Sequence, residues 1–79
     1  MKIEVLGPGC HRCEALHRNT QRALEATGLE ASLEKVSDIE KMIQYGILAT
    51  PGLAIDGKVV CTGRVPAPKE IEGWIQAAV

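Results

Sequence analysis

Two cysteines separated by two residues, Cys10 and Cys13, are the strongest chemical signal in the sequence. They lie in a glycine-rich stretch that leads from an apolar segment into a helical pattern, Leu6-Gly7-Pro8-Gly9-Cys10-His11-Arg12-Cys13. This spacing places the two thiols one turn apart on one helix face, close enough for a disulfide bridge. Cys10 lies at the amino end of that helix, where unpaired backbone N–H groups and the helix macrodipole favour a thiolate over a thiol.

Such a pair has three interpretations: a redox-active dithiol, a metal clamp or a structural disulfide. In the redox interpretation Cys10 attacks a target disulfide, and Cys13 then resolves the mixed disulfide. In the metal interpretation the two thiolates bind a soft ion such as Cu(I), Zn or an arsenite-like ion. The third cysteine, Cys61, makes the number odd and argues against a disulfide scaffold. We expect Cys61 to be a small buried hydrophobe, the alternative being a third thiol near the pair.

Three polar residues near the pair are candidates for tuning its thiols. Arg12, and His11 when protonated, would lower the pKa of Cys10 by stabilising its thiolate. The alternative for His11 is a solvated side chain without a role. Glu4 lies six residues ahead of Cys10 and alternates with the apolar residues of the first strand pattern. It is either a buried proton acceptor for Cys13, with a pKa raised by desolvation, or a carboxylate that reaches solvent at a sheet edge.

The hydrophobic pattern predicts the elements that position these residues. Alternation over residues 2–6 indicates a first strand, and helical spacing of apolar residues from Cys10 onward indicates a helix that Gly28 ends. Alternation over residues 29–34 predicts a second strand. A strand, a helix and a strand of this length favour a parallel right-handed crossover.

A short helix is predicted next. Ser37 and Glu40 are spaced as a capping box at its start. Its apolar face is expected to consist of Ile39, Met42 and Ile43.

A hairpin and a last helix complete the pattern. Asp56-Gly57 between two apolar segments, residues 53–55 and 58–62, predicts a β-hairpin with a type I′ turn. Pro68 suits the first turn of the final helix. The order is therefore βαβαββα, and we expect an α/β arrangement in which helices cover a four-stranded mixed sheet.

Composition excludes several classes of function. The 79 residues predict one small domain that is 46% hydrophobic and 24% charged, with a formal net charge of −1. That balance predicts neither nucleic acid nor a membrane surface as a partner. No apolar run approaches a membrane span, and the strand pattern after Met1 is too short for a signal peptide. We therefore expect a cytoplasmic protein, in which such a cysteine pair is more often catalytic or metal-binding than structural.

Taken together, these features resemble the thioredoxin-fold oxidoreductases, in particular the minimal, glutaredoxin-sized thioredoxin-like proteins of prokaryotes. The resemblance is carried by Gly9-Cys10-His11-Arg12-Cys13 after the first strand, Thr50-Pro51 before the third and Gly63 after the fourth. It extends over essentially the whole chain. It implies a minimal thioredoxin fold over residues 1–79, with three helices flanking a sheet of order 2-1-3-4.

The resemblance also implies roles for several residues. Pro51 would be cis, in a loop that faces the cysteine pair. Thr50 before it would offer backbone hydrogen bonds to an extended substrate segment, with Gly63 in the same substrate-binding region. Glu4 has the place of the buried acid that assists proton transfer at the second cysteine in many thioredoxins.

The predicted function is thiol–disulfide exchange by a monomer that needs no cofactor and no metal. Its partners would be a disulfide-containing protein substrate and a thioredoxin-reductase-like electron donor. The main alternative is a soft-metal-binding protein or metallochaperone that uses the same cysteine pair. The ferredoxin-like metallochaperone fold is disfavoured, because a capped helix follows the second strand and the chain ends in a helix. A redox-insensitive interaction module is a third option.

Overall fold

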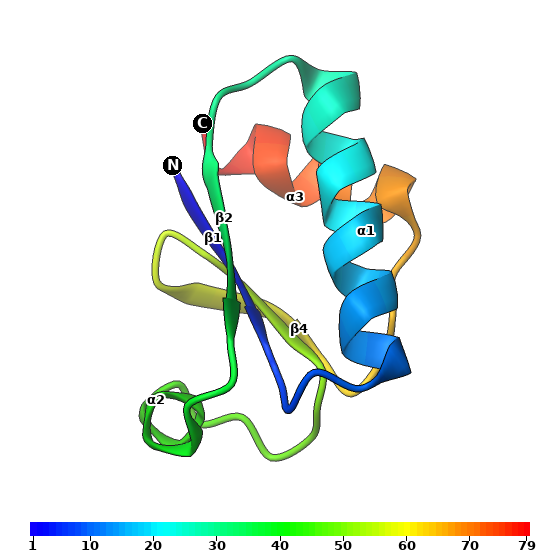
Figure 1. The fold of residues 1–79 in the computed structure, drawn as a ribbon. Coiled ribbons are helices and arrows are strands. Elements are labelled where there is room, and N and C mark those ends of the chain that lie inside the picture. The colour runs from blue at the N-terminus through cyan, green and yellow to red at the C-terminus, as the bar shows by residue number, and fades with distance from the viewer.

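A four-stranded sheet with helices on both faces is formed by residues 1–79, all of which the computed structural model describes (Figure 1). The elements follow the predicted order, βαβαββα. Their bounds are β1 (Lys2–Leu6), α1 (His11–Thr27), β2 (Ser32–Val36), α2 (Ile39–Gln44), β3 (Gly52–Ile55), β4 (Lys58–Thr62) and α3 (Pro68–Ala77). None of the three helices is both long and apolar enough to cross a membrane.

The strands lie in the order β2-β1-β3-β4, which confirms the predicted mixed sheet. β1 is parallel to β2 and antiparallel to β3, and β3 is antiparallel to β4. The parallel pair is joined through α1, as a crossover connection requires. β1 is therefore a central strand, and the loop that follows it leads directly to the cysteine pair.

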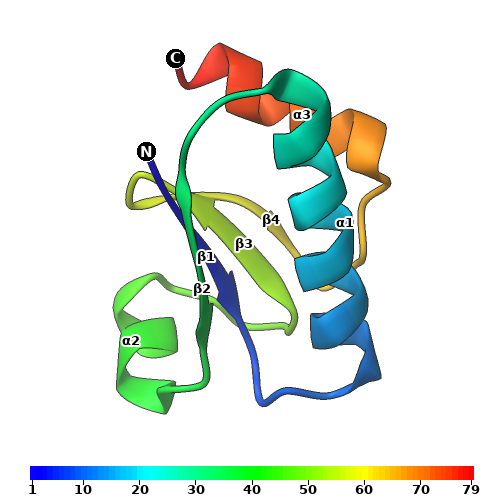
Figure 2. The ribbon, with the colours of Figure 1, turned by 45° about the horizontal axis from the view of Figure 1, so that its top comes forward.

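Two apolar layers fill the space between the sheet and the helices. Figure 2 shows α1 and α3 on one face of the sheet and α2 on the other. The larger layer packs strand residues against α1 and α3, and its buried members are Ile3, Val5, Leu16, Ala23, Leu53, Ile55, Ile71 and Ile75. The smaller layer consists of Leu6, Met42 and Ala54. Because side chains alternate along a strand, Glu4 faces the α2 side of the sheet, as Leu6 does.

The second strand begins later than the sequence predicts. Apolar alternation predicts a strand over residues 29–34, but β2 extends over Ser32–Val36. Its position is set by pairing with β1, which starts where Lys2 lies opposite Ser32. The two apolar residues ahead of β2 belong to the connection after α1 and pack against the larger layer from there.

The short helix α2 differs from its prediction in two ways. The predicted cap is Ser37, but Asp38 caps the helix, because its carboxylate accepts a 3.0 Å hydrogen bond from the backbone N–H two residues later. Of the three predicted core residues only Met42 is buried, whereas Ile39 and Ile43 are 71% and 69% exposed. The side of α2 that contacts the sheet is therefore rotated away from its apolar pattern.

Three element ends form as local sequence chemistry predicts. Gly28 ends α1 with a left-handed backbone, φ 68°, and its N–H donates to the carbonyl of Leu24 at 3.0 Å. In the hairpin turn, Asp56 and Gly57 both have positive φ, 49° and 83°, as a type I′ turn requires. Pro68 is the first residue of α3, a position at which a backbone N–H would have no partner within the helix.

Candidate active site

Cys10 occupies the N-cap position of α1, so its thiol lies at the open amino end of the helix. Cys10 is exposed, whereas Cys13, one turn further along, is only 5% exposed. Their sulfur atoms are 3.4 Å apart, and both residues are free thiols. The helix start thus brings an accessible thiol next to a buried one.

The pKa of the Cys10 thiol is lowered from its ordinary value of 9.0 by its place at the helix start. The largest cause is a hydrogen bond from the backbone N–H of Cys13, followed by one from the Cys13 thiol. Burial acts in the opposite direction, and the backbone N–H groups of Arg12 and of Cys10 itself add to the lowering. These donors stabilise the thiolate, which is the form that attacks a disulfide.

Alkylation of Cys10 is expected to follow this lowered pKa. The rate constant with iodoacetamide should rise through a midpoint below pH 9.0, measured with peptide mass spectrometry to separate Cys10 from Cys61. In a Cys13→Ala variant the thiol donor is lost and the backbone N–H remains, so the midpoint should move upward without reaching 9.0. A wild-type midpoint at 9.0 or above would contradict the role of the helix start.

Of the two residues between the cysteines, Arg12 acts differently from its predicted role as a charged neighbour, and the role of His11 stays a prediction. Arg12 influences the Cys10 thiol through its backbone N–H, while its guanidinium reaches across the site and donates from Nη2 to the carbonyl of Gly63 at 2.7 Å. His11 is the first residue of α1 and is exposed. Arg12 therefore joins the helix start to the turn after β4.

The loop before β3 and the turn after β4 lie against the start of α1 (Figure 1). The peptide bond between Thr50 and Pro51 is cis. Gly63 donates its N–H to the carbonyl of Pro51 at 2.9 Å, and its own carbonyl accepts the Arg12 bond. On the buried side, Thr50 and the Cys13 thiol both lie within 4 Å of the side-chain position of Gly7. Three segments far apart in sequence therefore meet at the cysteine pair.

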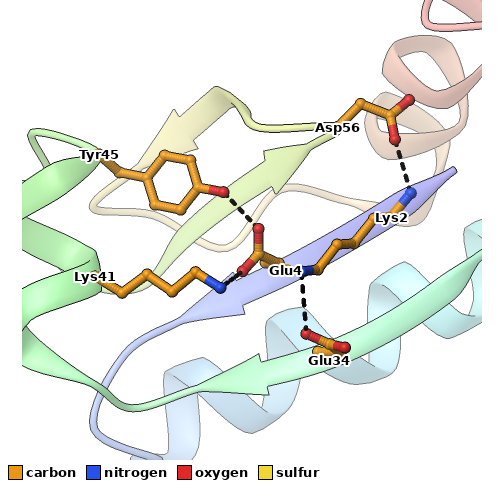
Figure 3. Close-up of polar contacts among 6 residues, drawn as sticks. All are labelled: Lys2, Glu4, Glu34, Lys41, Tyr45 and Asp56. Carbon is orange, nitrogen blue, oxygen red and sulfur yellow. Dashed lines mark hydrogen bonds and ion pairs between the residues drawn. The ribbon is translucent and has the colours of Figure 1, made fainter.

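Glu4 is buried in the central strand with only 2% of its surface exposed, and Figure 3 shows its carboxylate between two side chains from the α2 region. The Tyr45 hydroxyl donates to Oε1 at 2.5 Å, and Nζ of Lys41 lies 2.9 Å from Oε2. Burial, the largest single influence, raises the pKa of Glu4, but the hydrogen bonds from Tyr45 and Lys41 and the charges of Lys41 and Lys2 together lower it below 4.5.

The predicted burial of Glu4 is confirmed, but its predicted raised pKa and the alternative at a sheet edge are both wrong. The sequence predicts a carboxylate at a sheet edge or one with a raised pKa, whereas Glu4 lies on a central strand and its pKa is lowered. The reason is the cation of Lys41, which compensates for burial. No hydrogen bond joins Glu4 to either cysteine, and its role as proton acceptor for Cys13 stays a prediction.

Sequence reasoning missed the two partners of Glu4, Lys41 and Tyr45. Their hydrogen bonds to the carboxylate raise the pKa values of both the Lys41 ammonium and the Tyr45 hydroxyl. The signal that could have found them is their spacing. They lie four residues apart, at α2 and its C-cap, and so share the helix side that faces the sheet.

Cys61 lies on β4 opposite Leu53 and packs, partly exposed, against the larger apolar layer. It is a free thiol, and the structure contains no group of three or more His, Cys, Asp or Glu side chains that could hold a metal ion. The metal-binding alternative therefore rests on Cys10 and Cys13 alone.

The chain is similar in sequence to known thioredoxins. The chain matches the family described as "Thioredoxin domain" over residues 1–76. It is 38% identical over 72 residues to a thioredoxin of Methanothermobacter thermautotrophicus, covering 91% of this chain and 94% of that protein. It is 33% identical over 70 residues to a thioredoxin of Methanocaldococcus jannaschii, covering 89% and 80%. A probable thioredoxin of Methanothermobacter marburgensis is 35% identical over 75 residues, covering 90% and 87%.

Proposed function

The chain belongs to the thioredoxin family of thiol–disulfide oxidoreductases, and we propose that it reduces protein disulfides with the Cys10–Cys13 pair. The observation that carries the proposal is the exposed Cys10 thiol with a lowered pKa, 3.4 Å from a buried second thiol. An exposed thiol whose thiolate form is stabilised, with a resolving thiol beside it, has the two properties that exchange requires.

The reaction proceeds in two exchanges. The Cys10 thiolate attacks one sulfur of the target disulfide, the target S–S bond breaks, and the departing target thiolate takes up a proton. Cys13 then loses its proton and attacks the Cys10 sulfur, which forms the Cys10–Cys13 disulfide and releases the second target thiol. Two electrons pass from this chain to the target, and a thioredoxin-reductase-like donor returns them.

The target segment is proposed to bind in an extended form beside Cys10. Thr50 and Pro51 would offer backbone hydrogen bonds, and Gly63 would border the same position. The bonds that join Arg12, Gly63 and Pro51 support this proposal, because they hold the loop before β3 and the turn after β4 at the start of α1. The proposed location is the cytoplasm, where such a pair is kept cycling by reductants.

A redox titration in dithiothreitol buffers tests the proposal. Thiol content measured by mass shift after alkylation should show one two-electron transition, with a midpoint between about −300 and −120 mV, the range of exchange-active pairs. A Cys10→Ser variant should lose the transition. Stoichiometric metal that remains bound through purification, without a reversible disulfide, would overturn the proposal in favour of the metal-binding alternative.

A further inference from the structure

Gly7 follows β1 directly and lies against the buried thiol of the pair. A methyl group at its Cα would overlap the Sγ of Cys13, and it would lie 3.6 Å from the Cβ of Cys13 and 3.7 Å from the Cβ of Thr50. The sulfur of Cys13 therefore occupies the space that any other residue at position 7 would need for its side chain.

Backbone conformation does not require glycine at this position. Left-handed φ values occur at five other glycines, which are Gly9, Gly28, Gly46, Gly57 and Gly63. Gly7 is not one of them, so alanine can adopt its backbone conformation without strain. Its N–H donates to the carbonyl of Val36 at 2.9 Å, a bond that alanine would keep. Alanine differs from Gly7 only by its methyl group, which would need the space that the Cys13 sulfur occupies.

We propose that Gly7 is a positioning residue for the resolving thiol. Its missing side chain lets the Sγ of Cys13 lie 3.4 Å from the Sγ of Cys10, the atom that it attacks in the second exchange. In a helix only two χ1 rotamers are readily available to Cys13, so a methyl group at position 7 turns the sulfur toward the other one rather than shifting it slightly. The inference rests on the proposed function, in which Cys13 closes the disulfide.

The two exchanges should respond differently to a Gly7→Ala substitution. The first exchange depends on the Cys10 thiolate, which the added methyl group does not touch. Moving the Cys13 sulfur removes one of the hydrogen bonds that stabilise this thiolate, as Cys13→Ala also does, so the first exchange should slow no more than it does in Cys13→Ala. The second depends on the distance between the sulfurs. Because a displacement of only about 1 Å can slow a positioned reaction about 10²-fold, a change of rotamer should slow the decay of the mixed disulfide by about 10²-fold or more. Because the displaced sulfur disfavours the disulfide relative to the dithiol, the reduction potential should also become less negative.

Gly73→Ala is the matched control. Gly73 lies in α3 with an ordinary φ and no atom within 4 Å of its side-chain position, so the same substitution adds a methyl group to open space. Rapid quenching of single-turnover mixtures followed by mass spectrometry measures formation and decay of the mixed disulfide separately. Gly73→Ala should match the wild type in both steps. Gly7→Ala should form the mixed disulfide at least as fast as Cys13→Ala does, but its mixed disulfide should decay far more slowly than that of the wild type.

A decay rate and a reduction potential in Gly7→Ala equal to those of the wild type would overturn the proposal. A wild type that forms no mixed disulfide at all would instead overturn the proposed function.

Unfolding measurements test the claim that the Cys13 sulfur fills the space at Gly7, and they need no exchange reaction. Gly7→Ala should lower the free energy of unfolding in the wild-type background. The same substitution should leave that free energy unchanged when Cys13 is already alanine. An equal loss of stability in both backgrounds would show that the sulfur is not what Gly7 accommodates, and this comparison decides the claim even if Gly7→Ala folds poorly.

Discussion

A Cys13→Ser variant is expected to capture its target as a stable mixed disulfide at Cys10 and to lose turnover. The serine hydroxyl keeps the size of the thiol, but it is not ionised near neutral pH and does not attack the Cys10 sulfur. Steady-state reduction of a disulfide-bonded test protein should fall on the order of 10³-fold or more, the scale of losing an essential nucleophile. The adduct is measured by mass spectrometry under non-reducing conditions.

Two further cysteine variants are the controls for this prediction. Cys10→Ser should form no adduct, because the attacking thiolate is gone. Cys61→Ser should turn over like the wild type, because Cys61 packs against the larger apolar layer and no hydrogen bond joins it to Cys10 or Cys13. Loss of turnover in Cys61→Ser, or full turnover in Cys13→Ser, would show that a different thiol resolves the mixed disulfide.

A Glu4→Gln variant is expected to be less stable than the wild type by about 1–3 kcal/mol at pH 7. The amide oxygen can still accept the hydrogen bond from the Tyr45 hydroxyl, but the amide NH₂ group then faces the Lys41 ammonium. Two hydrogen-bond donors therefore replace the ion pair. The site is buried at Glu4, so water does not replace the lost acceptor. Urea unfolding measures the free energy of unfolding of both proteins.

The pH dependence of this difference has a definite sign. The pKa of Glu4 is lower in the folded chain than its ordinary value of 4.5, so the ionised carboxylate stabilises the fold fully above that value. This contribution is lost as the pH falls from 4.5 toward the folded pKa. The gap between wild type and Glu4→Gln should therefore be widest above pH 4.5 and narrow in more acidic solution. A gap that does not change with pH would contradict the ion pair.

The same variant separates two roles for Glu4. If its carboxylate accepts the proton of Cys13, Glu4→Gln should also slow the decay of the mixed disulfide in a pH-dependent way. If it only anchors α2 through Lys41 and Tyr45, single-turnover kinetics should be unchanged across pH while stability falls. Glu34→Gln is the control, since Glu34 is half-exposed and lies 3.8 Å from its partner Lys2, and it should alter neither quantity appreciably (Figure 3).

Local chemistry made most of the fold predictable. The order of elements follows from the change between two-residue and helical periodicity, which each segment carries in its own residues. Gly28, the Asp56-Gly57 turn and Pro68 mark element ends, because a left-handed φ or a missing N–H is a property of the residue itself. The bounds of β2 were not predictable in this way, because pairing with β1 decides which residues join the sheet.

The sequence by itself determined that Cys10 begins a helix and that Cys13 lies one turn further, since both depend on neighbouring residues alone. Only the tertiary structure decided the pKa shift of Glu4 and the partner of the Arg12 guanidinium. Lys41 and Tyr45 reverse the predicted pKa shift of Glu4 from 37 and 41 positions away, and Gly63 engages Arg12 from 51 positions away. The physical reason is that a pKa and a hydrogen bond depend on distances of a few ångströms, which the packing of α2 and of the two loops sets.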